Sequence, residues 1–134
     1  MIEQIYRNYL EIKSLKNLKE IEKPSENYSI ELVNPKDFQL NKFFYKNVGK
    51  NYQWVDRLLW TDQNWIKYVS DSRLSTYVLK DKKELVGFFE LLFYKDIKET
   101  EVAYFGILEN YFGKKLGGYL LSEAIKLSFS TGSL

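Results

Sequence analysis

Two apolar runs in the second half of the chain limit what it can fold into. The runs 84–94 (ELVGFFELLFY) and 101–108 (EVAYFGIL) carry apolar side chains at successive positions instead of alternate ones. A strand with this pattern is buried on both faces, so helices must cover both sides of its sheet. A shorter run at 75–80 precedes them, and polar turns at 81–83 and 95–100 join the three runs. We therefore expect two consecutive antiparallel hairpins.

The segments around these hairpins supply helices and an edge strand. Helical spacing of apolar residues, with capping residues before it and glycine after it, marks where each helix begins and ends. We expect a strand over 28–33 and then a helix over 34–48, with Asn34 as its N-cap, Pro35 in its first turn and Gly49 at its end. A second helix is expected over 61–71, capped by Thr61 and Asp62, with Trp65, Ile66 and Val69 facing inward. A last helix is expected over 115–129.

The first 27 residues differ from the rest of the chain. Residues 2–13 alternate β-branched and aromatic side chains with polar ones, which predicts a strand. Residues 16–27 are charged and contain Pro24, which is typical of a linker. We therefore divide the chain into an N-terminal strand and linker, 1–27, and one α+β domain over 28–134, in which helices cover a mostly antiparallel central sheet.

Composition narrows the chemistry that the chain can perform. It has 134 residues with no cysteine and no histidine, which excludes thiolate or imidazole metal sites, a cysteine nucleophile and an imidazole base. Lysine and arginine number 20 against 18 acidic residues, so a net charge of +2 gives little attraction to nucleic acid. No apolar run is long enough to cross a membrane, and we expect a cytoplasmic protein. Any chemistry must use carboxylates, tyrosine, lysine or the backbone.

A glycine-rich stretch, YFGKKLGGYLL (111–121), lies between the last apolar run and the last expected helix. Glycines at the start of a helix let a phosphate approach the unpaired amides without meeting a Cβ. Alternatively, Gly113 only supplies a turn, and Gly117 and Gly118 only let the helix pack against the sheet. From the residues alone, both interpretations remain open.

The segments 84–94 and 101–125 together resemble the middle of GNAT acetyltransferases. That family carries a QxxGxG or RxxGxG signature between its fourth strand and third helix, where loop amides hold the pyrophosphate of acetyl-CoA. The register places Phe112 at the first position of the signature, Lys115 at its first glycine and Gly117 at its last glycine. With the preceding strand, the resemblance implies that the co-substrate acetyl-CoA is bound by Phe105, Gly106, Ile107, Phe112, Gly113, Lys114, Lys115, Leu116, Gly117 and Gly118.

The resemblance spans about residues 28–130 and implies a three-layer fold whose C-terminal strands are missing from this chain. The strand at 101–108 would then be an uncovered apolar edge, a form that recruits other strands. We expect either a fragment or a chain completed by a partner. In the second case a homodimer forms, or residues 2–13 exchange as a strand with another copy.

Three residues are catalytic candidates. Gly106 interrupts its strand and suggests a bulge that would aim the Ile107 amide at the thioester oxygen, although Gly106 would also relieve crowding beneath a helix. Glu90 is the only charged residue in the segment 85–94 (LVGFFELLFY), so we interpret it as the general base. A hairpin that turns near Ile97 places Glu90 opposite Tyr104, and a structural hydrogen bond between these two is the alternative.

Residues 47–63 (NVGKNYQWVDRLLWTDQ) are similar to the acceptor-side helices of one bacterial GNAT subgroup. Here aromatic residues surround Asp56 and Arg57, so the cluster either walls an acceptor pocket in which Asp56 attracts an amine or forms the core side of two helices. We expect core for Trp65, and acceptor contacts from Tyr52, Trp54 and Arg57.

The function that follows is acetyl-CoA-dependent N-acetyl transfer to a small-molecule or peptide amine. The alternative is a non-catalytic GNAT-like module that binds CoA or serves in assembly. We do not expect a metal ion, a membrane or a nucleic acid to take part.

Overall fold

In a computed structural model, residues 23–52, 54–114 and 116–130 are described, and they contain a four-stranded antiparallel sheet in the order β1-β2-β3-β4. The strands are β1 (Tyr28–Leu32), β2 (Leu74–Asp81), β3 (Glu84–Tyr94) and β4 (Glu99–Ile107); the helices are α1 (Phe38–Tyr52), α2 (Asp62–Val69) and α3 (Leu116–Ser130), with short 3-10 turns η2 (Lys95–Ile97) and η3 (Glu109–Tyr111). This confirms the expected α+β class and both hairpins. The strand predicted over 2–13 and the linker up to residue 22 lie outside the described residues.

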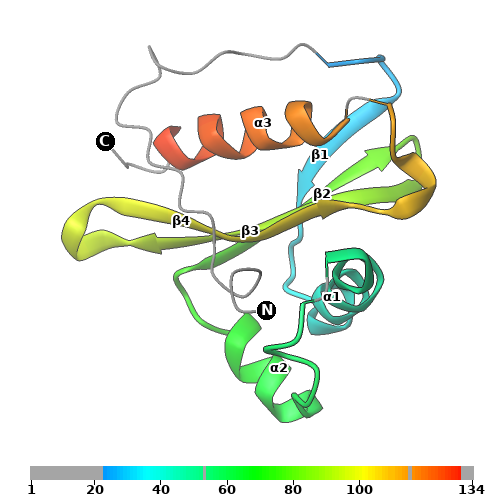
Figure 1. The fold of residues 1–134 in the computed structure, drawn as a ribbon. Helices are drawn as coiled ribbons and strands as arrows, with labels where there is room; N and C mark the ends of the chain where they lie inside the picture. Colours follow the sequence, from blue (N-terminus) through cyan, green and yellow to red (C-terminus); the bar gives the residue numbers. More distant parts are fainter. Residues whose placement is uncertain (1–22, 53, 115, 131–134) are drawn as a thin grey trace.

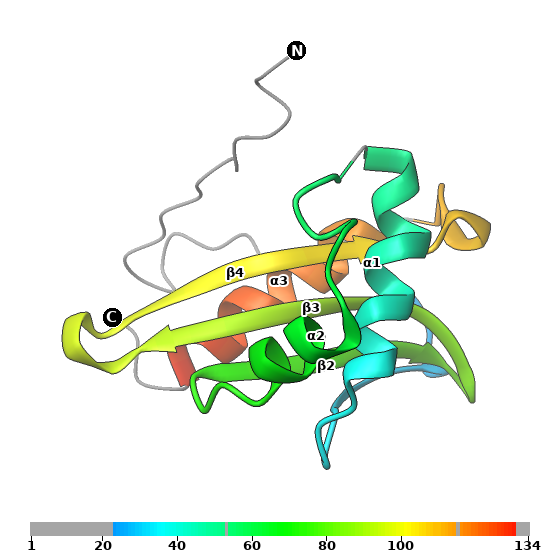
Figure 2. The ribbon, with the colours of Figure 1, turned by 90° about the horizontal axis from the view of Figure 1, so that it is seen from below.

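Helices cover both faces of the sheet, as the apolar runs predict. Figure 1 shows α3 on one face, and α1 and α2 on the other. Seen from below, α1 and α2 lie in front of the strands (Figure 2). The sheet is therefore the middle of three layers, and β3 lies between β2 and β4 at its centre.

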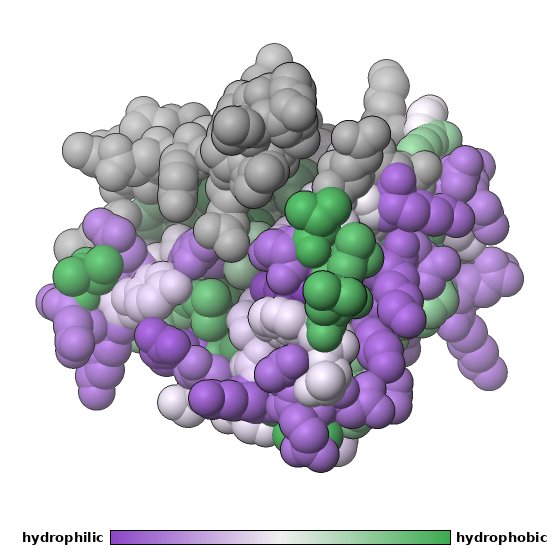
Figure 3. All heavy atoms as spheres, turned by 60° about the horizontal axis from the view of Figure 1, so that its bottom comes forward, coloured by the Kyte–Doolittle hydropathy of each residue, from purple (hydrophilic) through white to green (hydrophobic). Residues whose placement is uncertain are grey.

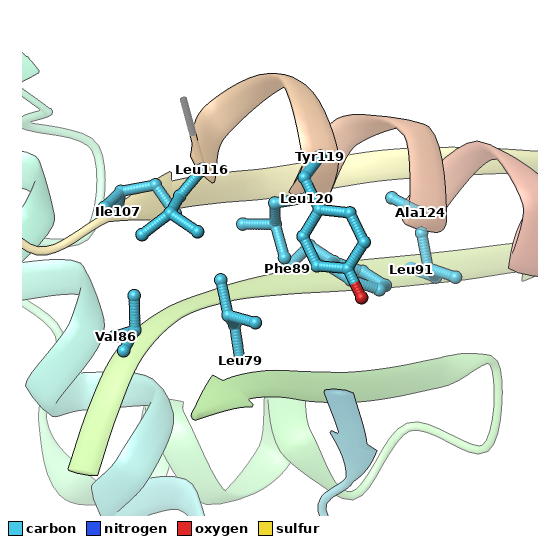
Figure 4. Packing of buried hydrophobic residues seen from close by; sticks show 9 residues of the cluster. All are labelled: Leu79, Val86, Phe89, Leu91, Ile107, Leu116, Tyr119, Leu120 and Ala124. Atoms are coloured by element: carbon cyan, nitrogen blue, oxygen red, sulfur yellow. The ribbon is translucent and has the colours of Figure 1, made fainter. Parts of the chain in front are cut away.

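The face of the sheet beneath α3 carries the larger apolar core. Leu120 and Ala124 of α3 are fully buried against Phe89 of β3 (Figure 4). The helical spacing of these α3 residues places them on one stripe, and each large side chain buried in this way contributes about 1.5–3 kcal/mol relative to exposure. The expected helix over 115–129 is confirmed by this packing.

On the opposite face, α1 lies close to the sheet because Gly106 has no side chain. The ring of Phe44 stacks on that of Phe88 at 4.8 Å between centroids. A Cβ at Gly106 would lie only 2.3 Å from Cγ1 of Val48, so the glycine relieves crowding beneath the helix. The bulge expected at Gly106 is wrong, because Gly106 pairs regularly with Phe88. The register of β3 and β4 shifts instead between Glu90 and Leu91.

Helix α1 begins and ends later than the sequence predicts. Val33 still bonds to the carbonyl of Thr76, so the chain stays extended there, and the Gln39 amide donates to Oδ1 of Asp37 at 3.0 Å at the start of the helix. The helix then continues through Gly49. A Cβ at that glycine would lie 2.8 Å from Cε3 of Trp54, so Gly49 admits the indole ring instead of ending the helix.

Helix α2 begins where predicted. Thr61 is its N-cap and forms a capping box with Asn64, which satisfies two amides that have no partner within the helix. Trp65 and Val69 are buried as expected, whereas Ile66 is 39% exposed. The prediction for Ile66 is wrong because the buried stripe of this short helix is narrower than its apolar pattern suggests.

Candidate functional site

A buried carboxylate lies at the centre of the sheet face that carries α1 and α2. Glu90 is the middle of β3, and because side chains alternate along a strand it points away from the α3 core that Phe89 and Leu91 enter. Its side chain is 0% exposed. Oε2 accepts from Asn41 Nδ2 at 2.9 Å, and Oε1 accepts from the Tyr68 hydroxyl at 2.6 Å. A buried charge is tolerated only with such partners.

Arg57 supplies the charge that balances Glu90. Its Nη1 lies 3.2 Å from Oε1 of Glu90. The guanidinium also sits over the rings of Tyr68, at 4.1 Å from the centroid, and Tyr104, at 4.4 Å. Burial alone would lower the pKa of Arg57, but the Glu90 carboxylate raises it above its ordinary value. The arginine is therefore a permanent cation held in an aromatic cage.

The residue before this arginine, Asp56, carries a second carboxylate, and it is exposed. Its Oδ1 accepts hydrogen bonds from the hydroxyls of Tyr45, at 3.1 Å, and Tyr104. The Tyr45 oxygen in turn accepts from the backbone amide of Arg57 at 2.9 Å. Burial, with the nearby Asp56 charge, raises the pKa of Tyr45 to about 12, and burial and the bond to Asp56 raise the pKa of Tyr104. Both phenols stay protonated near neutral pH and act as donors.

Two backbone amides near the end of β4 point away from β3. Among the described strands, β4 pairs only with β3. Leu108 donates its amide to the Val86 carbonyl at 2.8 Å, toward β3. Because successive amides of a strand point to alternate sides, those of Ile107 and Phe105 point to the open edge. The Ile107 side chain itself packs into the core beneath α3.

The glycine-rich turn joins this edge to α3. Gly113 has φ +83°, a conformation that favours glycine. A Cβ added at Gly117 would meet nothing within 4 Å, so packing against the sheet does not require a glycine there. Leu116 is buried, whereas Phe112, Lys114 and Gly118 are exposed; Lys115 lies outside the described residues. A Cβ added at Gly113 would likewise meet no described atom within 4 Å.

Comparison with known proteins identifies the family of this chain. A sequence model of the acetyltransferase (GNAT) family matches residues 36–133. The chain belongs to the GNAT family. A search of curated protein sequences finds no match.

Solved GNAT structures share this fold. An aminoglycoside acetyltransferase from an uncultured soil metagenomic sample, in complex with sisomicin, has a TM-score of 0.66 at 10% identity over 81% of this chain and 74% of that chain. The ribosomal-protein-S18-alanine N-acetyltransferase from Escherichia coli has a TM-score of 0.59 at 13% sequence identity, and the match covers 78% of this chain and 61% of that chain. The spermidine/spermine N-acetyltransferase from Vibrio cholerae has a TM-score of 0.55 at 18% sequence identity, and the match covers 79% of this chain and 64% of that chain. The chain thus spans less than two thirds of the last two, and at these identities the likeness shows the fold alone.

Within the GNAT fold, Glu90 and Tyr104 face each other across β3 and β4, as the sequence predicts. They bond to different partners, however. Glu90 is held by Asn41, Arg57 and Tyr68, and Tyr104 by Asp56. A direct structural hydrogen bond between the two is therefore not the reason for their placement.

Asn41 and Tyr68 are members of this network that were not predicted from the sequence. Asn41 is fully buried, and its Nδ2 also bonds to Oγ1 of Thr76 at 2.9 Å. One signal was available: Asn41 is a polar residue within the apolar spacing of α1, as Glu90 is within β3. Two isolated polar residues on faces that must pack together indicate a buried pair.

The aromatic acceptor candidates have different environments. The Trp54 ring is half-buried and lies 4.4 Å from that of Tyr104, between centroids. Trp65 is 2% exposed, which confirms it as core. Tyr52 is the last residue of α1, and its side chain lies outside the described part.

Two further properties concern the described residues only. No group of three or more acidic residues there is arranged to hold a metal ion. No helix in that part of the chain has the length and apolar character needed to span a membrane.

Proposed function

We propose that this GNAT chain transfers the acetyl group of acetyl-CoA to an amine. The unprotonated amine nitrogen attacks the thioester carbon, the C–N bond forms as the C–S bond breaks, and the proton that the nitrogen loses balances the thiolate, so CoA leaves as the thiol. The observation that carries the proposal is the end of β4, which among the described strands pairs only with β3 and whose outward amides lead directly into a glycine turn where a Cβ on Gly113 or Gly117 would meet no described atom within 4 Å. Acetyl-CoA is an extended molecule that carries a thioester at one end and a pyrophosphate further along. The strand amides would bind the thioester, and the amides of the turn before α3 would bind the pyrophosphate.

The amides of Ile107 and Phe105 would hold the acyl part of the co-substrate. A backbone N–H aimed at the thioester oxygen stabilises the negative charge that develops when the amine attacks. Gly106 sits between them, and its missing side chain brings α1 close to this edge. A homodimer that paired along this edge would use the same amides, so we place the co-substrate there instead of a second copy.

The turn before α3 would hold the pyrophosphate. The first amides of a 15-residue helix have no partner within it and carry partial positive charge. Open space at Gly117 supports this function over one in internal packing. Exposed Lys114 and the neighbouring Gly118, with Gly113, Lys115 and Leu116, complete the set, and a lysine adds charge favourable to phosphate.

The structure suggests a more indirect role for Glu90 than general base. A base must come within hydrogen-bond reach of the acceptor nitrogen, directly or through one water. Glu90 has no exposed surface, and its carboxylate already accepts hydrogen bonds from three side chains. We propose that Glu90 positions Arg57, and through it the acceptor side, while Tyr104, whose hydroxyl donates to Asp56, positions that carboxylate beside β4.

The alternative function is a module that binds CoA without catalysis. It is favoured by Phe112, which is 46% exposed where the family signature has glutamine or arginine. Incubation of the purified chain with isotopically labelled acetyl-CoA and a panel of primary amines separates the two. Acetylated amine, detected by mass spectrometry, supports transfer; CoA binding without product supports the module.

A further inference from the structure

Asp56 is a carboxylate that the transfer mechanism above does not use. It lies in the segment between α1 and α2, and Tyr104 joins it to β4. The next residue along β4, Phe105, directs its amide to the open edge where the thioester would lie. Asp56 is therefore close to the reacting end of the proposed co-substrate.

The hydrogen bonds of Asp56 leave one oxygen for a ligand. Tyr45 and Tyr104 both donate to Oδ1, so the two phenols hold the carboxylate in one orientation without using Oδ2. Asp56 is exposed, unlike Glu90. A fixed, exposed carboxylate oxygen is suited to a donor that arrives from solvent.

The charge at Asp56 favours a cation as that donor. Among the described residues, Asp56 forms no ion pair, and its neighbour Arg57 pairs with Glu90 instead. The Glu90 carboxylate balances the positive charge of Arg57, and aromatic rings enclose the guanidinium. Arg57 therefore does not cancel the negative charge of Asp56. An ammonium group would make a charge-assisted hydrogen bond here.

Exposed apolar side chains surround Asp56 in the sequence. Val55 is 53% exposed, Leu58 57% and Leu59 94%. Figure 3, which brings the α1 and α2 side forward, shows hydrophobic side chains gathered on the surface of that side. Large apolar side chains exposed together mark a binding surface more often than isolated ones do.

We propose that Asp56 binds the ammonium group of the acceptor and that Val55 and Leu58 contact its apolar substituent, so the acceptor is a cationic amine with a hydrocarbon or aromatic body. This inference rests on the proposed acetyl transfer. It excludes polyamines as the preferred class, since a second charge at the far end would meet apolar side chains.

Three probes of similar length test the proposal: hexylamine, hexanol and hexamethylenediamine. Binding to the full chain at neutral pH, without acetyl-CoA, is measured by NMR chemical-shift titration. We expect hexylamine to bind more tightly than either of the others. Asp56→Asn keeps an oxygen for both phenols but removes the charge, and it should weaken hexylamine binding by about tenfold or more.

Two further variants test the apolar part. A Val55→Ser/Leu58→Ser double variant should weaken hexylamine binding by about threefold or more and leave hexamethylenediamine unchanged. Ile97→Ser is the control, because Ile97 is an apolar side chain of similar exposure, 60%, at the far end of the β3–β4 hairpin. It should change the binding of neither hexylamine nor hexamethylenediamine. No binding of hexylamine by the wild-type chain, preference for hexamethylenediamine, or equal binding by Asp56→Asn would overturn the inference. Asp56-dependent binding without acetyl transfer would instead contradict the proposed function.

Discussion

Glu90 and Arg57 form a buried ion pair, with Oε1 3.2 Å from Nη1 and side chains that are 0% and 5% exposed. Glu90 belongs to the central strand, whereas Arg57 belongs to the segment between α1 and α2. The pair therefore fixes that segment, including Asp56, to the sheet. Removing one member would leave the other charge buried without its partner.

Glu90→Gln should lower the free energy of unfolding by about 3 kcal/mol, because the Arg57 cation loses its counter-charge. Urea denaturation measures this. A Glu90→Gln/Arg57→Met double variant is the matched control, and it should recover most of the loss since no charge is left unpaired. If Glu90 is instead the general base, Glu90→Gln would keep its stability and lose acetyl transfer by roughly 10²-fold.

Gly106→Ala should destabilise the fold by about 1–3 kcal/mol, because the new Cβ would lie 2.3 Å from Cγ1 of Val48. The change is measured by thermal or urea unfolding. Adding Val48→Ala removes the clashing atom, so the double variant should lose less than the sum of the two single variants. Strict additivity would contradict the close packing of α1 on β4.

The sequence predicted the layers of this fold because they follow from local patterns. The strand 84–94 matches β3 in full, and Thr61 caps α2 as expected. The end of α1 at Gly49 and the bulge at Gly106 were wrong predictions. Gly106 relieves crowding against Val48 of α1, which is the alternative stated for it, and Gly49 admits the ring of Trp54, which follows five residues later. Both contacts depend on how the chain packs, and the spacing of apolar residues does not predict that.

The candidate site was predictable only in part. Glu90 stands out as the one charged residue inside an apolar strand that begins with Glu84, and the hairpin register places it opposite Tyr104. Its partners come from three separate segments: Asn41 from α1, Tyr68 from α2, and Arg57 from between them. Their proximity depends on how the helices pack on the sheet, and sequence spacing alone does not specify it.

Stability should fall as pH rises from about 10 to about 12, in part through Tyr45. Its pKa is raised to about 12, mainly by burial. When the pKa of a group is higher in the folded state than in the unfolded state, its protonated form stabilises the fold. For Tyr45 this contribution is complete below the unfolded pKa of about 10 and is lost as pH rises through the pKa of the folded state. Tyr45→Phe isolates this effect.

Urea denaturation of wild-type and Tyr45→Phe chains across that range measures it. We expect the variant to be less stable below pH 10, since it lacks the hydroxyl that bonds to Asp56 and to the Arg57 amide. The difference should narrow as pH rises toward 12. A difference independent of pH would contradict the raised pKa.

Calorimetric titration of acetyl-CoA into the wild-type chain and Gly117→Val tests whether the turn at the start of α3 holds the pyrophosphate. We expect saturable binding to the wild-type chain. We expect no binding to Gly117→Val, whose side chain would occupy the space that the phosphates need beside the first turn of α3, while its far-UV circular dichroism is unchanged. Gly117→Ala adds only a Cβ and should fall between the two. Equal affinity in wild-type and Gly117→Val, or no binding to a folded wild-type chain, would contradict the account.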